Sequence, residues 1–136
     1  MNKAKLLAFS LATVLALGSG TALAAGDAAK GEKGFKRCKA CHALEAGKKK
    51  TGPSLHGIFG RTAGTAEGYK FSKSLKAAGE KGLKWDEAQM MEYLKDPTAF
   101  LKGYLGQDKV SNKMKNKFKK ESLRADIIAY LKEATK

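Results

Sequence analysis

The stretch CKACH, residues 38–42, contains both cysteines of the chain and one of its two histidines. A disulfide between Cys38 and Cys41 would close a loop of only four residues, which restricts the unfolded chain very little. A structural zinc site needs four ligands, and the chain has only one further Cys or His, His56. A redox dithiol of the thioredoxin type should follow a strand in a βαβ pattern, which the sequence lacks. These three uses of the motif are therefore disfavoured.

The fourth use of a C-x-x-C-H motif is covalent attachment of haem. Two thiols at this spacing can add to the two vinyl groups of a haem, and the next residue, a histidine, then lies under the iron as proximal ligand. We therefore predict thioether bonds at Cys38 and Cys41, with His42 on the iron.

The N-terminal residues are typical of a secretory signal peptide. Two lysines precede a mostly apolar run over residues 6–17, and Ala22 and Ala24 occupy the −3 and −1 positions of an A-x-A cleavage site. An uncleaved membrane anchor is the alternative, but 12 mostly apolar residues are short against the roughly 20 that a spanning helix needs. We predict removal of residues 1–24, a single mature domain of residues 25–136, and a periplasmic location, because bacterial c-type haem is attached outside the cytoplasm.

The predicted mature chain is strongly basic, with 25 Lys and Arg against 13 Asp and Glu, a formal net charge of +12. Nucleic acid is one possible partner for such a charge. Export would separate the chain from cytoplasmic DNA, and the sequence has no recognisable nucleic-acid-binding motif. The charge therefore favours an acidic protein surface as partner. A domain of 112 residues has a modest apolar core of its own, so a buried cofactor would add much to its stability.

The pattern of apolar residues predicts an all-α domain with long loops. Nothing alternates with period two for long enough to form a sheet. A glycine-rich loop is expected over residues 43–68, and Pro97 should end the third helix near Asp96. The first helix is predicted to begin after Asp27, and three more should cover residues 72–78, 86–96 and 98–105. The last helix should follow Ser122 as its N-cap and carry on one face Leu123, Ile127, Tyr130, Leu131 and Ala134.

The ligand on the second face of the iron decides the function. An open position would allow catalysis or ligand binding, whereas a second strong protein ligand leaves an iron that only exchanges electrons. Met90 and Met91 fall inside a predicted helix, where Met usually fills the core, and His56 falls in the glycine-rich loop. Met114 lies in the irregular stretch SNKMKNKF with no apolar residue on either side. Met114 is the favoured candidate because its sulfur is a soft ligand suited to haem iron, and the other three remain possible.

Several stretches together resemble the class I cytochromes c, most closely the bacterial cytochrome c2 type. The resemblance covers nearly all of the mature sequence, and both the order and the spacing of the stretches agree. They are GDAAKGEKGFKRCKACH, KTGPSLHGIFGRTAG, Gly68 with Tyr69, Trp85, MMEYLKDP, Lys113 with Met114, and DIIAYL. The resemblance implies a fold of three to five helices and long loops wrapped around one covalently bound haem.

The resemblance also implies roles for individual residues. Met114 would close the haem crevice as the second axial ligand, and the Pro53 carbonyl would accept a hydrogen bond from the outer nitrogen of His42. The first and last helices should cross, with Gly31 and Phe35 against Ile127, Tyr130 and Leu131. Arg61, Tyr69 and Trp85 resemble family residues that hydrogen-bond the haem propionates or offset their charge. Tyr93 resembles a buried tyrosine near the Met sulfur, and Leu55 and Leu94 resemble residues that pack against the haem.

Three positions depart from the family pattern. The aromatic residue usual two places after the ligand Met is replaced by Asn116, and Phe118 follows two places later. Either the loop brings Phe118 inward or the haem edge is more open to water. Phe71 replaces a tyrosine often used on a propionate, and Asn112 stands where a threonine is common in mitochondrial members.

The resemblance implies a soluble, monomeric, periplasmic one-electron carrier rather than an enzyme. It would take an electron from a cytochrome bc complex and pass it to a cytochrome c oxidase or a photosynthetic reaction centre. A haem enzyme or ligand sensor with a labile sixth position is the alternative. Exposed lysines near the haem edge would steer docking onto acidic partners; the candidates are Lys36, Lys39, Lys49, Lys50, Lys113, Lys115 and Lys117.

Overall fold

The computed structural model describes residues 25–136, so the predicted signal peptide lies outside the described residues. This part of the chain contains five helices and, in place of a sheet, one isolated bridge between Thr62 and Lys84. The prediction of an all-α fold is confirmed. The helices are α1 (Ala28–Phe35), α2 (Lys73–Glu80), α3 (Glu87–Lys95), α4 (Pro97–Leu105) and α5 (Glu121–Ala134).

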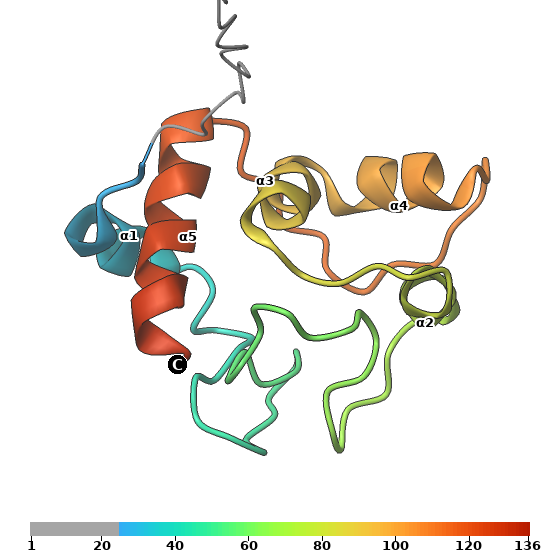
Figure 1. Cartoon of the computed structure of the whole chain (residues 1–136), viewed down its shortest axis with the longest axis horizontal. Helices are drawn as coiled ribbons and strands as arrows, with labels where there is room; N and C mark the ends of the chain where they lie inside the picture. Colours follow the sequence, from blue (N-terminus) through green and yellow to red (C-terminus); the bar gives the residue numbers. More distant parts are fainter. Residues whose placement is uncertain (1–24) are drawn as a thin grey trace, which may run out of the picture.

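The terminal helices α1 and α5 pack against each other at one end of the molecule (Figure 1). The crossing is close because Gly31 has no side chain. A Cβ placed there would lie 1.9 Å from the carbonyl oxygen of Asp126 and 2.8 Å from the Cβ of Tyr130. The Phe35 and Tyr130 rings meet beside it, with centroids 5.3 Å apart. The predicted contact between the first and last helices is confirmed.

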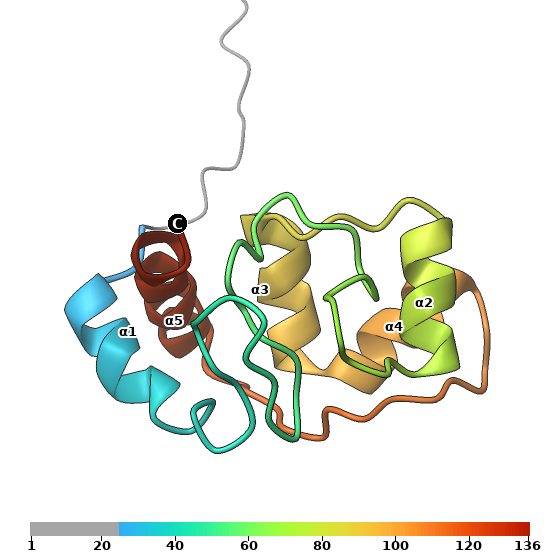
Figure 2. The ribbon, with the colours of Figure 1, turned by 90° about the horizontal axis from the view of Figure 1, so that it is seen from below.

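Helices α2 and α4 form the other end, α3 lies between them and α5, and the long loops run across one face of the molecule (Figure 2). Side-chain oxygens cap each of these helices. Ser72 accepts from the Leu75 amide, Asp86 accepts from the Gln89 amide at 2.7 Å, and Asp96 accepts from two amides of the first turn of α4. Pro97 at the first position of α4 ends α3, as predicted.

The start of α5 differs from the prediction. Helix α5 begins at Glu121 after Lys120, which makes no side-chain capping bond, so Ser122 lies within the first turn instead of capping it. The chain just before α5 is held by the buried Arg124 side chain, which reaches back five and six residues. Its guanidinium donates to the carbonyls of Phe118 at 2.8 Å and Lys119 at 2.7 Å. The helix over 72–78 is also longer than predicted and reaches Glu80.

One hydrophobic core joins the two ends of the molecule. Its fully buried side chains include Phe35 from α1, Leu101 from α4 and Ile127 from α5. Within residues 25–136, no helix has both the length and the apolar character needed to span a membrane.

Candidate functional site

A cavity of about 790 Å³ opens between the core and the loops. Its volume lies within the range of roughly 300–1,000 Å³ typical of ligand sites, and it is far larger than the voids that close packing leaves in a protein interior. All of the predicted haem residues line it: Cys38, Cys41, His42, Pro53, Leu55, Arg61, Tyr69, Trp85, Tyr93, Leu94 and Met114.

The CKACH motif reaches the cavity because the chain keeps turning after α1 ends. The amides of Cys38 and Lys39 donate to the Phe35 carbonyl, and the His42 amide donates to the Cys38 carbonyl at 2.9 Å. This helix-like turn brings both thiols and the imidazole to one wall. All three side chains are half-buried.

The state of the thiols argues against the metal and redox uses of the motif. No disulfide joins the two cysteines, and burial raises the pKa of the Cys38 thiol to about 11. A reactive dithiol needs a lowered thiol pKa. In the described part of the chain, no three His, Cys, Asp or Glu side chains are grouped to hold a metal ion.

A hydrogen bond between its Nδ1 and the Pro53 carbonyl oxygen holds the His42 ring. Nδ1 lies 2.8 Å from the Pro53 carbonyl oxygen, so Nδ1 carries the proton and Nε2 has its lone pair available to bind a metal. Burial lowers the pKa of His42, partly offset by this hydrogen bond, and the positive charges of Arg61 and Lys50 lower it further. The imidazole is therefore neutral at neutral pH, the form that binds a metal.

Gly52 makes this arrangement possible. A Cβ at that position would lie 2.7 Å from Cε1 of His42 and 2.9 Å from the Cys41 carbonyl oxygen. Any side chain there would press the ring away from the Pro53 carbonyl.

Two polar side chains, Arg61 and Tyr69, line another part of the wall. Arg61 donates to the carbonyls of His56 at 3.1 Å and Ser54 at 3.0 Å, and burial lowers its pKa. The Tyr69 hydroxyl donates to the Thr51 carbonyl at 3.0 Å. Both side chains therefore brace the loops, in addition to facing the cavity.

An aromatic wall completes the inner part of the cavity. The Trp85 and Tyr93 rings meet edge to face with centroids 4.9 Å apart, and both side chains are buried. Burial raises the pKa of Tyr93, and Tyr69 adds to the effect, so its hydroxyl stays protonated at neutral pH.

The four candidate sixth ligands separate into two groups. Met114 and Met90 line the cavity, whereas Met91 lines a second, small pocket and His56 is exposed on the surface. Met90 is buried in α3 with 5% of its surface exposed, and Met114 is half-buried in the irregular segment before α5. The position of Met90 on the cavity wall was not expected, because its helical spacing only indicated core packing.

The segment after Met114 includes Asn116, where the sequence departs from the family pattern, and Phe118. Phe118 is 1% exposed, its amide donates to the Leu94 carbonyl at 2.9 Å, and Arg37 lies 4.7 Å from the centre of its ring. Of the two alternatives, the loop brings Phe118 inward. Asn116 is exposed at the edge of the cavity, so a polar residue occupies the position where an aromatic is usual.

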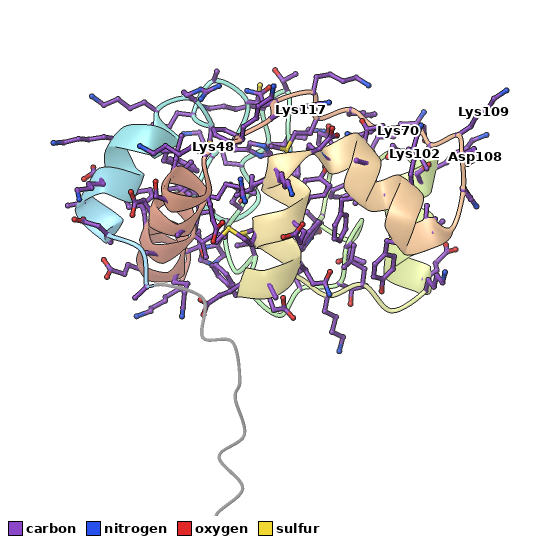
Figure 3. The ribbon with its side chains drawn as sticks, turned by 90° about the horizontal axis from the view of Figure 1, so that it is seen from above. Lys48, Lys70, Lys102, Asp108, Lys109 and Lys117 are labelled. Carbon is purple, nitrogen blue, oxygen red and sulfur yellow. The ribbon has the colours of Figure 1, made fainter. Side chains whose placement is uncertain are left out.

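All seven predicted docking lysines are exposed, but they differ in position. Lys49, Lys50, Lys113 and Lys115 border the cavity, whereas Lys36 and Lys39 do not. Lys117 forms an ion pair with Asp96 at 2.6 Å. Lys70 also borders the cavity, and Figure 3 places it on the same side of the molecule as Lys117. Sequence reasoning missed Lys70, because nothing in its neighbours distinguishes it from the other lysines.

Other cavity residues were missed because they are ordinary apolar or polar side chains. The chief examples are Ile58 in the glycine-rich loop, Leu75 on α2 and Asn112 near Met114. The helical spacing of Leu75 indicates only that it faces inward.

The chain is similar to known proteins over most of its length. A family model described as cytochrome c matches residues 28–135. Cytochrome c-550 of Novispirillum itersonii is 50% identical over 107 residues, which make up 78% of this chain and 96% of that protein. Cytochrome c2 of Cereibacter sphaeroides is 43% identical over 134 residues, 91% of this chain and 92% of the relative. The solved structure of cytochrome c2 from Rhodospirillum centenum aligns with a TM-score of 0.77 at 44% identity, over 82% of this chain and 100% of the other.

Proposed function

This chain belongs to the cytochrome c family and is an electron carrier with one covalently bound haem c, and we propose that His42 and Met114 are its two axial iron ligands. We further propose that the chain works in the periplasm after removal of residues 1–24. It would take electrons from a cytochrome bc complex and deliver them to a cytochrome c oxidase or a photosynthetic reaction centre.

The residues present fit a haem. The cavity has the volume of a ligand site and largely apolar walls, with Leu55 and Leu94 among the lining side chains. Two free thiols border the same cavity as a neutral imidazole whose Nε2 is free. This convergence of both cysteines and His42 on one large apolar cavity is the observation that carries the proposal.

The iron of a bound haem supplies a one-electron change between its ferric and ferrous states. The protein's part is to hold the ligands and exclude water. The Pro53 carbonyl fixes the His42 ring and increases the basicity of Nε2. A Met114 sulfur on the other face would raise the reduction potential, which suits a carrier working toward an oxidising partner. Trp85 and Tyr93 keep the inner wall apolar.

The surface charge supports a protein partner with an acidic face. Lys49, Lys50, Lys113 and Lys115 border the cavity mouth and are exposed. Such a group of charges accelerates encounter with an acidic surface at low salt and loses its effect as ionic strength rises. The rate of electron transfer to an acidic redox partner should therefore fall with added salt, and a flat profile would contradict the docking proposal.

The ligand proposal is tested by the ferric absorption spectrum of the holoprotein. A charge-transfer band between Met sulfur and iron should be present in the wild type and absent in Met114→Leu, and the reduction potential should fall in that variant. Met91→Leu is the control because Met91, which is as buried as Met90, lies outside the cavity. A band lost in Met90→Leu but kept in Met114→Leu would assign the sixth position to Met90. A high-spin ferric spectrum of the wild type at neutral pH would favour the enzyme or sensor alternative.

A further inference from the structure

The segment from Ser111 to Phe118, which we call the Met114 strap, borders the cavity without any regular secondary structure. Its two ends are fastened to helices. The Ser111 amide donates to the Ser74 hydroxyl of α2 at 2.8 Å, and the Phe118 amide donates to the Leu94 carbonyl of α3 at 2.9 Å. The strap follows the loop after α4, whose outer tip carries Asp108 and Lys109 (Figure 3).

Between these ends, one side chain holds Met114. The Asn112 Nδ2 donates to the Met114 carbonyl at 2.6 Å, and the Met114 amide donates to the Asn112 Oδ1 at 3.3 Å. The same Nδ2 lies 3.3 Å from the Thr98 hydroxyl on α4. Among the described residues, neither main-chain polar group of Met114 has a main-chain partner. The Asn112 amide therefore satisfies both groups and ties them to a rigid helix.

We propose that Asn112 is a positioning residue that keeps Met114 directed at the cavity and limits how often its sulfur leaves the iron. The inference rests on the proposed ligation by Met114. A Met side chain is unbranched and flexible, so its own rotamers restrain the sulfur little. The main chain that carries it must then supply the restraint, and Asn112 holds that main chain on both sides of the Met114 Cα.

This role has a measurable consequence for external ligands. An added ligand can occupy the sixth position only in molecules from which the Met sulfur has withdrawn, so its apparent affinity is proportional to the fraction in that open state. Asn112→Ala removes all three hydrogen bonds and should increase the open fraction. For bonds of ordinary net strength, two of them long, we expect imidazole to bind about tenfold more tightly.

The experiment titrates imidazole into the ferric holoproteins and follows loss of the Met-sulfur charge-transfer band. Ser111→Ala is the matched control. Ser111 directly precedes Asn112, and among the described residues its side chain bonds only to Ser74 and not to Met114. We expect Asn112→Ala to bind imidazole about tenfold more tightly, and Ser111→Ala to stay within about twofold of wild type. Asn112→Ser can still accept from the Met114 amide but is too short to reach Thr98, so its affinity should fall between the two.

Three results would decide against the inference. If Asn112→Ala and Asn112→Ser both bind imidazole within about twofold of the wild-type affinity, the Asn112 side chain does not restrain the sulfur. An equal effect of Ser111→Ala would show that any loosening of the strap suffices. Absence of the charge-transfer band in the wild type would overturn the ligation by Met114 itself, which separates failure of the proposed function from failure of the positioning role. Thermal midpoints of all variants identify any change in affinity that follows global stability alone.

Discussion

Replacing Gly31 with alanine is expected to destabilise the protein at the crossing of α1 and α5. The new Cβ would lie 1.9 Å from the Asp126 carbonyl oxygen and 2.5 Å from its carbonyl carbon. These are main-chain atoms of α5, so no side-chain rotation can relieve the overlap. The two helices would have to separate, which would disturb the Phe35–Tyr130 contact and the cavity wall that Ile127 and Leu131 form.

The magnitude follows from two opposing effects. Overpacking against rigid atoms costs about 3 kcal/mol or more, while alanine in place of glycine within a helix stabilises by about 1 kcal/mol. The net loss in the free energy of unfolding should be about 2 to 4 kcal/mol. For a domain of this size, that loss corresponds to a fall in the melting temperature of roughly 8 to 20 °C.

Guanidinium denaturation of the holoproteins, followed by far-UV circular dichroism, measures this effect. Gly103→Ala is the matched control, because Gly103 lies in α4 and a Cβ there would meet nothing within 4 Å. It should be neutral or more stable than wild type by about 0.5 to 1 kcal/mol. A Gly31→Ala protein as stable as wild type, or a Gly103→Ala protein destabilised to the same degree, would refute the close crossing.

Two further predictions concern the site and its surroundings. Gly52→Ala should push the His42 ring away from the Pro53 carbonyl and so reduce the basicity of Nε2. The reduction potential should then rise, by about 40 mV for each 1 kcal/mol of lost ferric stabilisation. An unchanged potential would contradict this reasoning. Hydrogen bonds from Lys117 and the backbone lower the pKa of Asp96, so this carboxylate stabilises the fold above about pH 4 and loses that effect as the pH falls through its lowered pKa. Asp96→Asn keeps an N-cap residue but has no charge to lose. Asp96→Asn should therefore be less stable than wild type at pH 6, and the difference in the free energy of unfolding, measured by denaturant titration, should be smaller at pH 3. A difference that is the same at both pH values would contradict the prediction.

Much of the local structure was predictable because it depends on neighbours within a few residues. Asp86 caps α3 and Pro97 separates α3 from α4, both as the sequence indicates. The start of α5 was not predictable in this way. Ser122 has the right chemistry for an N-cap, but α5 begins two residues earlier, after Lys120. The segment before it is held by a hydrogen bond from the Phe118 amide to the distant Leu94 carbonyl of α3.

The sequence by itself determined the chemistry of attachment, since Cys38, Cys41 and His42 are close in the chain and their spacing alone predicts what they hold. Only the tertiary structure decided which distant residues share the cavity with them. It brings Met90 and Met114 to the wall and leaves Met91 and His56 outside, and it turns Phe118 inward while Asn116 stays exposed. It also joins Asn112 to Thr98 of α4. The reason is that a residue's type and near neighbours fix its turn or helix, whereas its partners across the cavity depend on how α1, α5 and the loops pack together.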